Sequence, residues 1–246
     1  MSKHIFSRTP SMNDEQPWER GALAVTAGDL ALQPAAPVRA PARPASVAPA
    51  GANLFWHPSR IKPAERQALF TQRPATAWLT GLSGAGKSTI AFELERLMVE
   101  HGRRCFVLDG DNIRHRLNRD LGFSPAERKE NIRRVAEVAH LMNEAGLIVI
   151  TAFISPYRED RAMARDVIGA DRFVEVHVSA DASLCAARDP KGLYAKARAG
   201  SVASFTGVSA PYEPPESPDL TLDTGDLSLE EATHRLFTHL AVRFFH

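Results

Sequence analysis

The sequence predicts an α/β fold in which a mostly parallel sheet lies between two layers of helices, with a lid segment near one edge of the sheet. Short apolar runs alternate along the chain with stretches whose apolar residues recur at helical spacing. The first apolar run leads directly into a glycine-bearing loop and then into a helix. A basic segment at residues 188–200, framed by Gly192 and Gly200, has the composition of a lid over phosphates.

The expected strands and helices alternate along most of the chain. We expect strands at residues 76–80, 104–108, 147–153, 173–178 and 220–222. We expect helices at residues 63–70, from residue 87 onward, and at residues 125–145, 158–167, 182–187 and 229–244. Ser124 is a natural N-cap for the third of these helices, and Gly146 marks its end.

Composition limits the function classes. The 246 residues are 44% hydrophobic and 24% charged, as in ordinary globular proteins. The net charge of +1 gives no global basic field, so we expect no nucleic-acid partner. No run of about 18 apolar residues occurs, so we expect no membrane span. Cys105 and Cys185 lie in apolar contexts without metal-ligand spacing, which favours core cysteines in a reducing cytoplasm.

The first 50 residues differ from the rest. Residues 31–50 contain 8 Ala and 5 Pro and no aromatic residue, so this stretch buries too little apolar surface to offset its ordering entropy. We expect residues 1–50 to be a disordered tail or linker and residues 51–246 to form one folded domain. Acidic residues such as Asp14 and Glu15, and the lack of a continuous apolar core, argue against a targeting peptide. A partner-binding role for the tail stays open.

The loop after the first strand has the spacing of a phosphate-binding motif. Gly81 is followed after four residues by Gly86, Lys87 and Ser88, which is a Walker A pattern in its strand-loop-helix setting. Glycines allow close backbone approach, so successive N–H groups point at phosphate oxygens, and the helix N-terminus adds partial positive charge. We expect Lys87 to reach the β/γ-phosphates of a nucleoside triphosphate and Ser88 to be a ligand of Mg²⁺.

Polar residues follow the next two strands at their carboxyl ends. Asp109 and Asp111 follow the second strand, and Ser155 follows the third. Because ligands of open parallel sheets gather beyond these ends, we expect the acids to be functional.

An arginine-dense block lies between the acid pair and the third strand. Its residues Arg114, Phe123, Arg128 and Asn131 favour a second anionic substrate that carries a planar base. The alternative is a solvated helix face with ion pairs one turn apart, and for Arg133 and Arg134 the two interpretations are equally good.

Five blocks of sequence extend this interpretation. They read GLSGAGKST, LDGDNIRHRLNRDLGFSPAERKENIRR, AFISPYREDR, RDPKGLYAKARAG and FTGVSAPYE. In this order and spacing they resemble adenylylsulfate kinase over about residues 53–240. The resemblance implies a P-loop NTPase fold. It also implies transfer of a phosphoryl group from Mg²⁺-ATP to the ribose 3′-hydroxyl of adenosine 5′-phosphosulfate (APS), which gives 3′-phosphoadenylyl sulfate (PAPS) and ADP. A homodimer is a further implication.

The resemblance also implies site residues. The expected ATP site comprises Gly81, Ser83, Gly84, Ala85, Gly86, Lys87, Ser88, Thr89 and Arg188. The expected APS site comprises Asp111, Asn112, Ile113, Arg114, Phe123, Arg128, Asn131, Ile154, Ser155, Lys191 and Phe205, with the adenine stacked between Phe123 and Phe205. The expected catalytic residues are Lys87, Asp109, Asp111 and Ser155.

The roles of three of these residues are further specified. We expect Asp111 to accept or orient the hydroxyl proton and Asp109 to lie in the outer shell of the metal, although the two acids could exchange roles. Bacterial relatives are conventionally described with a phosphoserine at the position of Ser155. Direct in-line transfer needs no such relay, so we expect Ser155 to bind substrate.

Two departures from the family pattern and two alternatives accompany this interpretation. One departure is near Ser209, where the family usually has an acid. Arg116 stands where the family usually has glycine, and we expect it to strain the backbone or to occlude the APS pocket. Arg116→Gly should then lower KM for APS. The first alternative is another small-molecule P-loop kinase, such as a gluconate or shikimate type. The second is a catalytically weak scaffold domain that docks to sulfate adenylyltransferase.

Overall fold

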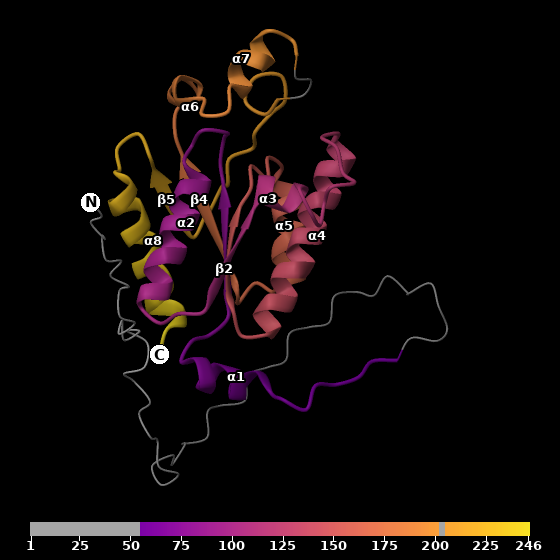
Figure 1. The fold of residues 1–246 in the computed structure, drawn as a ribbon, viewed down its shortest axis with the longest axis vertical. Coiled ribbons are helices and arrows are strands. Elements are labelled where there is room, and N and C mark those ends of the chain that lie inside the picture. The colour runs from indigo at the N-terminus through magenta and orange to yellow at the C-terminus, as the bar shows by residue number, and fades with distance from the viewer. Residues whose placement is uncertain (1–54, 202–204) are drawn as a thin grey trace, which may run out of the picture. The chain divides into compact units, whose positions relative to one another are not determined.

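The computed structural model describes residues 55–201 and 205–246, so the expected tail at residues 1–50 lies outside this part of the chain. Its centre is a five-stranded sheet in the order β2-β3-β1-β4-β5, and every neighbouring pair is parallel (Figure 1). The strands are β1 (Ala75–Thr80), β2 (Cys105–Asp109), β3 (Ile148–Ala152), β4 (Phe173–Ser179) and β5 (Leu220–Asp223).

Helices cover both faces of this sheet. The helices of the described residues are α1 (Pro63–Phe70), α2 (Lys87–Glu100), α3 (Gly110–Arg114), α4 (Pro125–Glu144), α5 (Arg158–Ile168), α6 (Ala182–Arg188), α7 (Leu193–Arg198) and α8 (Leu229–Phe244). The α2 and α8 helices lie on one side of the sheet, and α4 and α5 lie on the other (Figure 1). The predicted three-layer α/β/α fold is therefore confirmed.

Two apolar cores hold the layers together. On one face, Leu94 of α2 and Leu236 of α8 pack with the sheet, and both are fully buried. On the other face, Val135 of α4 and Ile168 of α5 pack around Trp78 of the central strand β1. The central strand is buried at all six positions, as expected for a parallel strand covered on both sides.

Two short helices were not among the expected elements. The α3 helix follows β2 directly, and its N-cap is Asp109, whose side chain accepts hydrogen bonds from the N–H groups of Asp111 and Asn112. The α7 helix lies within the basic segment between Gly192 and Gly200. Each spans only one or two turns, which is too short for an apolar period to show. Within the described ranges, no helix is long and apolar enough to cross a membrane.

Candidate active site

A cavity of about 1360 Å³ lies beyond the carboxyl ends of β2 and β3 and beside the loop after β1. This volume exceeds the roughly 300–1,000 Å³ typical of a site for one small ligand. The predicted residues that line it are Ser83, Gly84, Gly86, Lys87, Ser88, Thr89, Asp109, Asp111, Asn112, Arg114, Phe123, Arg128, Asn131, Ile154, Ser155, Arg188, Lys191 and Phe205. The structure thus brings most of the expected ATP and APS residues to one cavity.

Three predicted residues do not line the cavity. Gly81 lies so close to β4 that an added Cβ would come within 2.3 Å of the Val178 carbonyl oxygen. Ala85 is fully buried in the core on the α2 side, and Ile113 packs against the core on the α4 side. These three residues pack against β4 or the two cores, and they hold the loop and α3 in place on the side away from the cavity.

The loop between β1 and α2 has the backbone shape that a phosphate-binding loop needs. Gly84 and Gly86 have φ values of 82° and 99°, in the region that favours glycine. A Cβ on Gly84 would also lie 2.7 Å from the carbonyl oxygen of Cys185. Gly86 is the N-cap of α2, so the free N–H groups and partial positive charge of this helix end meet the cavity.

Lys87 is almost excluded from solvent, with 7% of its surface exposed. Its ammonium donates hydrogen bonds to the carbonyl oxygens of Gly81 at 2.8 Å and Leu82 at 2.7 Å. Burial lowers its pKa to about 8, while nearby acids, including Asp109 and Asp111, act in the opposite direction. A buried cation held only by neutral carbonyls is poorly compensated, so this site favours an anionic ligand.

Ser88 and Asp109 form a hydroxyl-carboxylate pair next to Lys87. The Ser88 hydroxyl donates to Asp109 Oδ2 at 2.7 Å, and Asp109 Oδ1 accepts from the N–H of Asp111 at 3.0 Å. One hydroxyl and one carboxylate suit Mg²⁺, which typically keeps several waters and binds through one or two side chains plus substrate phosphates. Among the described residues, no group of three or more His, Cys, Asp or Glu forms a separate metal cluster.

Asp111 lies two residues after Asp109, at the start of α3. Its carboxylate forms an ion pair with Lys191, which belongs to the segment between α6 and α7. Both side chains are more than half exposed within the open cavity, so solvent screens this pair. The contact nevertheless shows that the expected lid segment reaches across to the acid pair.

The arginines and the aromatic residue of the α3–α4 region form one wall. Phe123 is 63% exposed, with the Arg114 guanidinium 4.3 Å from its ring centroid and that of Arg128 at 5.9 Å. Arg114 donates to the carbonyl oxygens of Leu121 and Gly122, which fixes the turn that carries the ring. Burial lowers the pKa of both arginines, and both remain cations at neutral pH. This wall therefore offers positive charge beside an open aromatic face.

Phe205 occupies a different setting from Phe123. It is buried, and its ring meets that of Tyr194 in α7 edge to face, with centroids 5.0 Å apart. Next to it, Thr206 accepts a hydrogen bond from Arg128 Nη1 at 3.0 Å. Both aromatic rings line the cavity, but a stacking clamp between Phe123 and Phe205 stays a prediction.

Ser155 lies in the wall formed by the end of β3. It is 3% exposed, and its φ of 38° lies in the left-handed region, which is uncommon for a residue other than glycine. Its hydroxyl accepts a hydrogen bond from Trp78 Nε1 at 3.2 Å, the one partner that it has among the described residues. No carboxylate or histidine of this part of the chain contacts the hydroxyl, so no base stands beside it.

A family model for adenylylsulphate kinase matches residues 73–223, which is more than half of the chain. The chain belongs to this family. A relative from Staphylococcus carnosus named adenylyl-sulfate kinase is 52% identical over 188 residues, which cover 76% of this chain and 94% of the relative. The bifunctional enzyme NodQ of Rhizobium tropici is 58% identical over 172 residues, and the match spans 27% of that longer protein.

Two solved structures resemble this adenylylsulfate kinase. The APS kinase CysC of Mycobacterium tuberculosis, in complex with AMPPNP and APS, has 49% identity and a TM-score of 0.66, covering 68% of this chain and 98% of that one. The hexameric APS kinase of Thiobacillus denitrificans has 36% identity and a TM-score of 0.54, covering 73% of this chain and 31% of that one. Family membership excludes the alternative of a gluconate- or shikimate-type kinase.

Arg116 does not behave in this kinase as its sequence position suggests. Its φ is not positive, because Thr71 and Ser155 are the non-glycine residues with positive φ in the described ranges. Its side chain is exposed and does not line the cavity. The expected strain or occlusion is therefore wrong, because the chain turns at this position without needing a glycine. The structure therefore gives no reason to expect a lower KM for APS in Arg116→Gly.

Arg133 and Arg134 also lie outside the cavity of the kinase. Arg133 pairs with Glu130 and Glu137 on α4, and Arg134 pairs with Asp120 and Glu130. The solvated interpretation of these two arginines is confirmed.

The kinase cavity contains residues that sequence reasoning missed. Thr224 accepts a hydrogen bond from Arg188 Nη1 at 2.9 Å and donates to the Ala85 carbonyl oxygen at 2.9 Å, which joins the phosphate loop to α6. Its place directly after β5 was a usable signal, since it lies at the same carboxyl edge. Asn118 does not line the cavity, but it is fully buried and donates to Oδ1 of the lining residue Asn131 at 3.0 Å, and no local pattern pointed to it.

Proposed function

We propose that this kinase transfers the terminal phosphoryl group of ATP to the ribose 3′-hydroxyl of APS, forming PAPS and ADP for sulfate assimilation. The observation that carries the proposal is one cavity that joins the phosphate loop to the wall of Arg114, Phe123 and Arg128. The M. tuberculosis relative, solved with AMPPNP and APS, supports two nucleotide ligands in such a fold.

On the ATP side, the phosphate loop and the N-terminus of α2 hold the phosphates. Lys87 exchanges its carbonyl partners for phosphate oxygens, because an anion compensates a buried ammonium better than neutral groups do. Ser88, oriented by Asp109, would hold Mg²⁺. The metal supplies charge neutralisation on the transferring group. Arg188 closes this side through its contacts with Thr224.

On the APS side, recognition combines charge with stacking. Arg114 and Arg128 hold the phosphosulfate by charge-assisted hydrogen bonds, and the open face of Phe123 stacks on adenine. The remaining proposed contacts come from Asp111, Asn112, Ile113, Asn131, Ile154, Ser155, Lys191 and Phe205. Ile113 acts by shaping α3 from behind, because its side chain packs in the core.

The two acids differ in their availability for the hydroxyl proton. Both carboxylate oxygens of Asp109 already accept hydrogen bonds, from Ser88 and from the start of α3. Asp111 presents an exposed carboxylate whose partner, Lys191, belongs to the lid segment. We therefore assign the accepting or orienting of the 3′-hydroxyl proton to Asp111. Transfer is direct and in line, and Ser155 binds substrate without forming a phosphoserine, because no base contacts its hydroxyl.

Four features of the whole protein belong to the same proposal. Residues 51–246 are the kinase domain, and residues 1–50 are a tail or linker. The protein acts in the cytoplasm as a homodimer. The tail offers a place for docking to sulfate adenylyltransferase, and the bifunctional NodQ relative makes a physical link to a second enzyme worth testing.

The test is ADP release from Mg²⁺-ATP by the purified protein, measured with and without APS. We expect ADP only when APS is present, and we expect Lys87→Met to lose this activity while it keeps the wild-type fold by circular dichroism. ADP release that ignores APS would contradict the proposal. Binding of both nucleotides without turnover would favour the scaffold alternative instead.

A further inference from the structure

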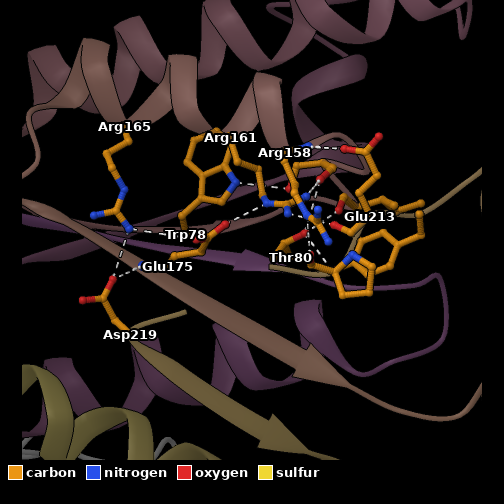
Figure 2. A network of polar contacts seen from close by, with 12 residues as sticks. Trp78, Thr80, Arg158, Arg161, Arg165, Glu175, Glu213 and Asp219 are labelled. Atoms are coloured by element: carbon orange, nitrogen blue, oxygen red, sulfur yellow. Dashed lines mark hydrogen bonds and ion pairs between the residues drawn. The ribbon is translucent and has the colours of Figure 1, made fainter. Parts of the chain in front are cut away.

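A network of ion pairs and hydrogen bonds includes Arg161, Glu175 and Asp219 (Figure 2). One of its acceptors is the carbonyl oxygen of Ser155, a residue of the cavity wall. Its centre is Arg161 of α5, whose side chain is 2% exposed. The guanidinium donates through all three of its nitrogens: Nε to Glu175 Oε1 at 2.7 Å, Nη1 to the Ser155 carbonyl oxygen at 2.7 Å, and Nη2 to the Glu213 carbonyl oxygen at 2.8 Å. One side chain thus joins β4, the end of β3 and the segment before β5.

The first thing that Arg161 holds is the strained turn at Ser155. A φ of 38° in a residue with a Cβ persists only where the surroundings fix it. Arg161 fixes the carbonyl of this residue, and Trp78 fixes its hydroxyl. Thr80, at the end of β1, donates to the neighbouring carbonyl of Ile154 at 2.7 Å. These three hydrogen bonds therefore fix the position of residues 154 and 155 in the cavity wall.

The second thing that Arg161 holds is the chain that returns from the lid. Glu213 lies eight residues after Phe205, and its N–H donates to the Pro156 carbonyl oxygen at 2.8 Å. Arg158, at the start of α5, donates its own N–H to Glu213 Oε2 at 2.8 Å. The segment after the lid is thus joined to the turn after β3, and Arg161 closes this junction from the buried side.

Glu175 and Asp219 balance the charge of the network. Asp219 accepts from the N–H of Glu175 at 2.8 Å, and Arg165 and Arg243 contact its carboxylate at 3.4 Å and 3.0 Å. Arg165 lies one turn after Arg161 and also contacts Glu175, at 3.9 Å, but it is 34% exposed. No contact of Arg165 with Ser155 or Glu213 occurs among the described residues, so the two arginines share Glu175 and differ in their other partners.

We propose that Arg161 is a positioning residue for APS: its guanidinium fixes both the Ser155 turn and the segment at Glu213 that follows the lid, and so shapes the APS side of the cavity. This inference rests on the proposed function. A planar group with fixed N–H directions is needed, because three acceptors in different directions must be satisfied at once. The phosphate loop and β2 form the ATP side of the cavity. Among the described residues, Arg161 makes no hydrogen bond to either of them.

The test compares Arg161→Lys with the matched control Arg165→Lys. In both variants the lysine keeps a positive charge beside Glu175. At position 161, however, one amino nitrogen replaces a guanidinium that donates hydrogen bonds to three acceptors. We expect Arg161→Lys to raise KM for APS at least about tenfold, equivalent to about 1.4 kcal/mol of binding free energy. We expect KM for ATP to stay within about twofold of wild type, and Arg165→Lys to leave both constants within that range.

A second variant keeps the test decisive if Arg161→Lys fails to fold. Trp78→Phe keeps an aromatic ring between Phe153 and Phe173 but removes the N–H that holds the Ser155 hydroxyl. We expect it to raise KM for APS alone. In the double variant with Arg161→Lys the two effects should be less than additive, because both act through the same turn.

Three results would overturn the inference: an unchanged KM for APS in either variant, an equal rise in KM for ATP, or the same effect in Arg165→Lys.

The inference and the proposed function fail separately. If wild-type protein makes no PAPS, the proposed function fails. If the wild type is active and the APS dependence of these variants is normal, only the role of Arg161 fails. Calorimetric titration with APS in the absence of ATP gives the same comparison without turnover.

Discussion

Lys87 places a titrating group at the phosphate site, because burial lowers its pKa to about 8. A triphosphate binds the ammonium form, so the affinity of the wild type for a non-hydrolysable ATP analogue should fall as the pH rises above about 8, by up to about tenfold per pH unit. In Lys87→Met the affinity should be weaker, and its dependence on pH in this window should be lost. Calorimetry across this range measures both. Constant affinity in the wild type would show that the ammonium does not contact the phosphates.

The two acids at the end of β2 should separate by their kinetics. Asparagine at position 109 keeps an oxygen for the N-cap of α3 but removes the charge that orients Ser88. We expect Asp109→Asn to raise the Mg²⁺ concentration for half-maximal activity by about 10-fold or more. We expect Asp111→Asn to lower kcat by about 100-fold with an unchanged Mg²⁺ requirement. Magnesium titrations of both variants measure this, and the reverse pattern would exchange the two roles.

Residue types and spacing, together with the family resemblance, predicted most of the residues that line the cavity. The Walker A glycines and the acids after β2 carry their chemistry in local sequence, so they could be placed at the sheet edge in advance. Arg116 could not be evaluated in this way, because its effect depends on the backbone angle that the chain adopts there. Arg161 was missed because its partners lie up to 52 residues away, and no local pattern marks a side chain that binds distant carbonyls.

At the scale of elements, the start of α4 carries the turn with Phe123. Ser124 and Glu127 form a reciprocal capping box there, and Glu127 also accepts from the N–H of Gly122 at 2.9 Å. The α8 helix begins with the same box, formed by Ser228 and Glu231. One kind of cap thus serves a helix beside the APS wall and a helix that packs beside α2, where its first residues line another part of the cavity.

This repetition allows a matched prediction. Ser124→Ala and Ser228→Ala should each lower the free energy of unfolding by about 1 kcal/mol, because each removes one side-chain N-cap. Only Ser124→Ala should also raise KM for APS, because it loosens the turn that carries Phe123. Denaturant unfolding and steady-state kinetics measure the two effects. A raised KM for APS in both variants would show that general destabilisation, and not the Phe123 turn, is responsible.

The sequence predicted helices and strands correctly where they were long enough to show a repeating pattern of apolar residues. The five strands and the helices α1, α2, α4, α5, α6 and α8 lie within a few residues of their expected positions. The α3 and α7 helices were missed because they have five and six residues. Their existence depends on local capping and on contacts with the cavity wall, which a repeating apolar pattern does not report.

At the scale of the whole molecule, the strand order was not predictable from the chain. The order β2-β3-β1-β4-β5 places the phosphate loop at the centre, with β3 on one side and β4 on the other. This order brings Asp109 and Ser155, from neighbouring strands, to one edge with Lys87. Local patterns predict that an edge is functional, while long-range packing decides which strand ends meet there.

The proposed division of the chain makes a prediction of its own. A variant that lacks residues 1–50 should keep the kcat and both KM values of the full chain, because every residue of the proposed site lies after residue 80. Steady-state kinetics of the two proteins measure this. If the tail docks the kinase to sulfate adenylyltransferase, deletion should abolish co-elution of the two enzymes in gel filtration. A loss of kcat on deletion would contradict the proposed domain boundary.

The central claim is that one cavity aligns ATP with the 3′-hydroxyl of APS. The most direct measurement is NMR of the nucleotide product formed from APS and Mg²⁺-ATP, with phosphorus-proton coupling used to locate the new phosphate on the ribose. We predict one added phosphoryl group on the 3′-oxygen and none on the protein by intact mass. A phosphate at the 2′-oxygen, or a phosphorylated Ser155 that passes its phosphate to APS, would contradict the account.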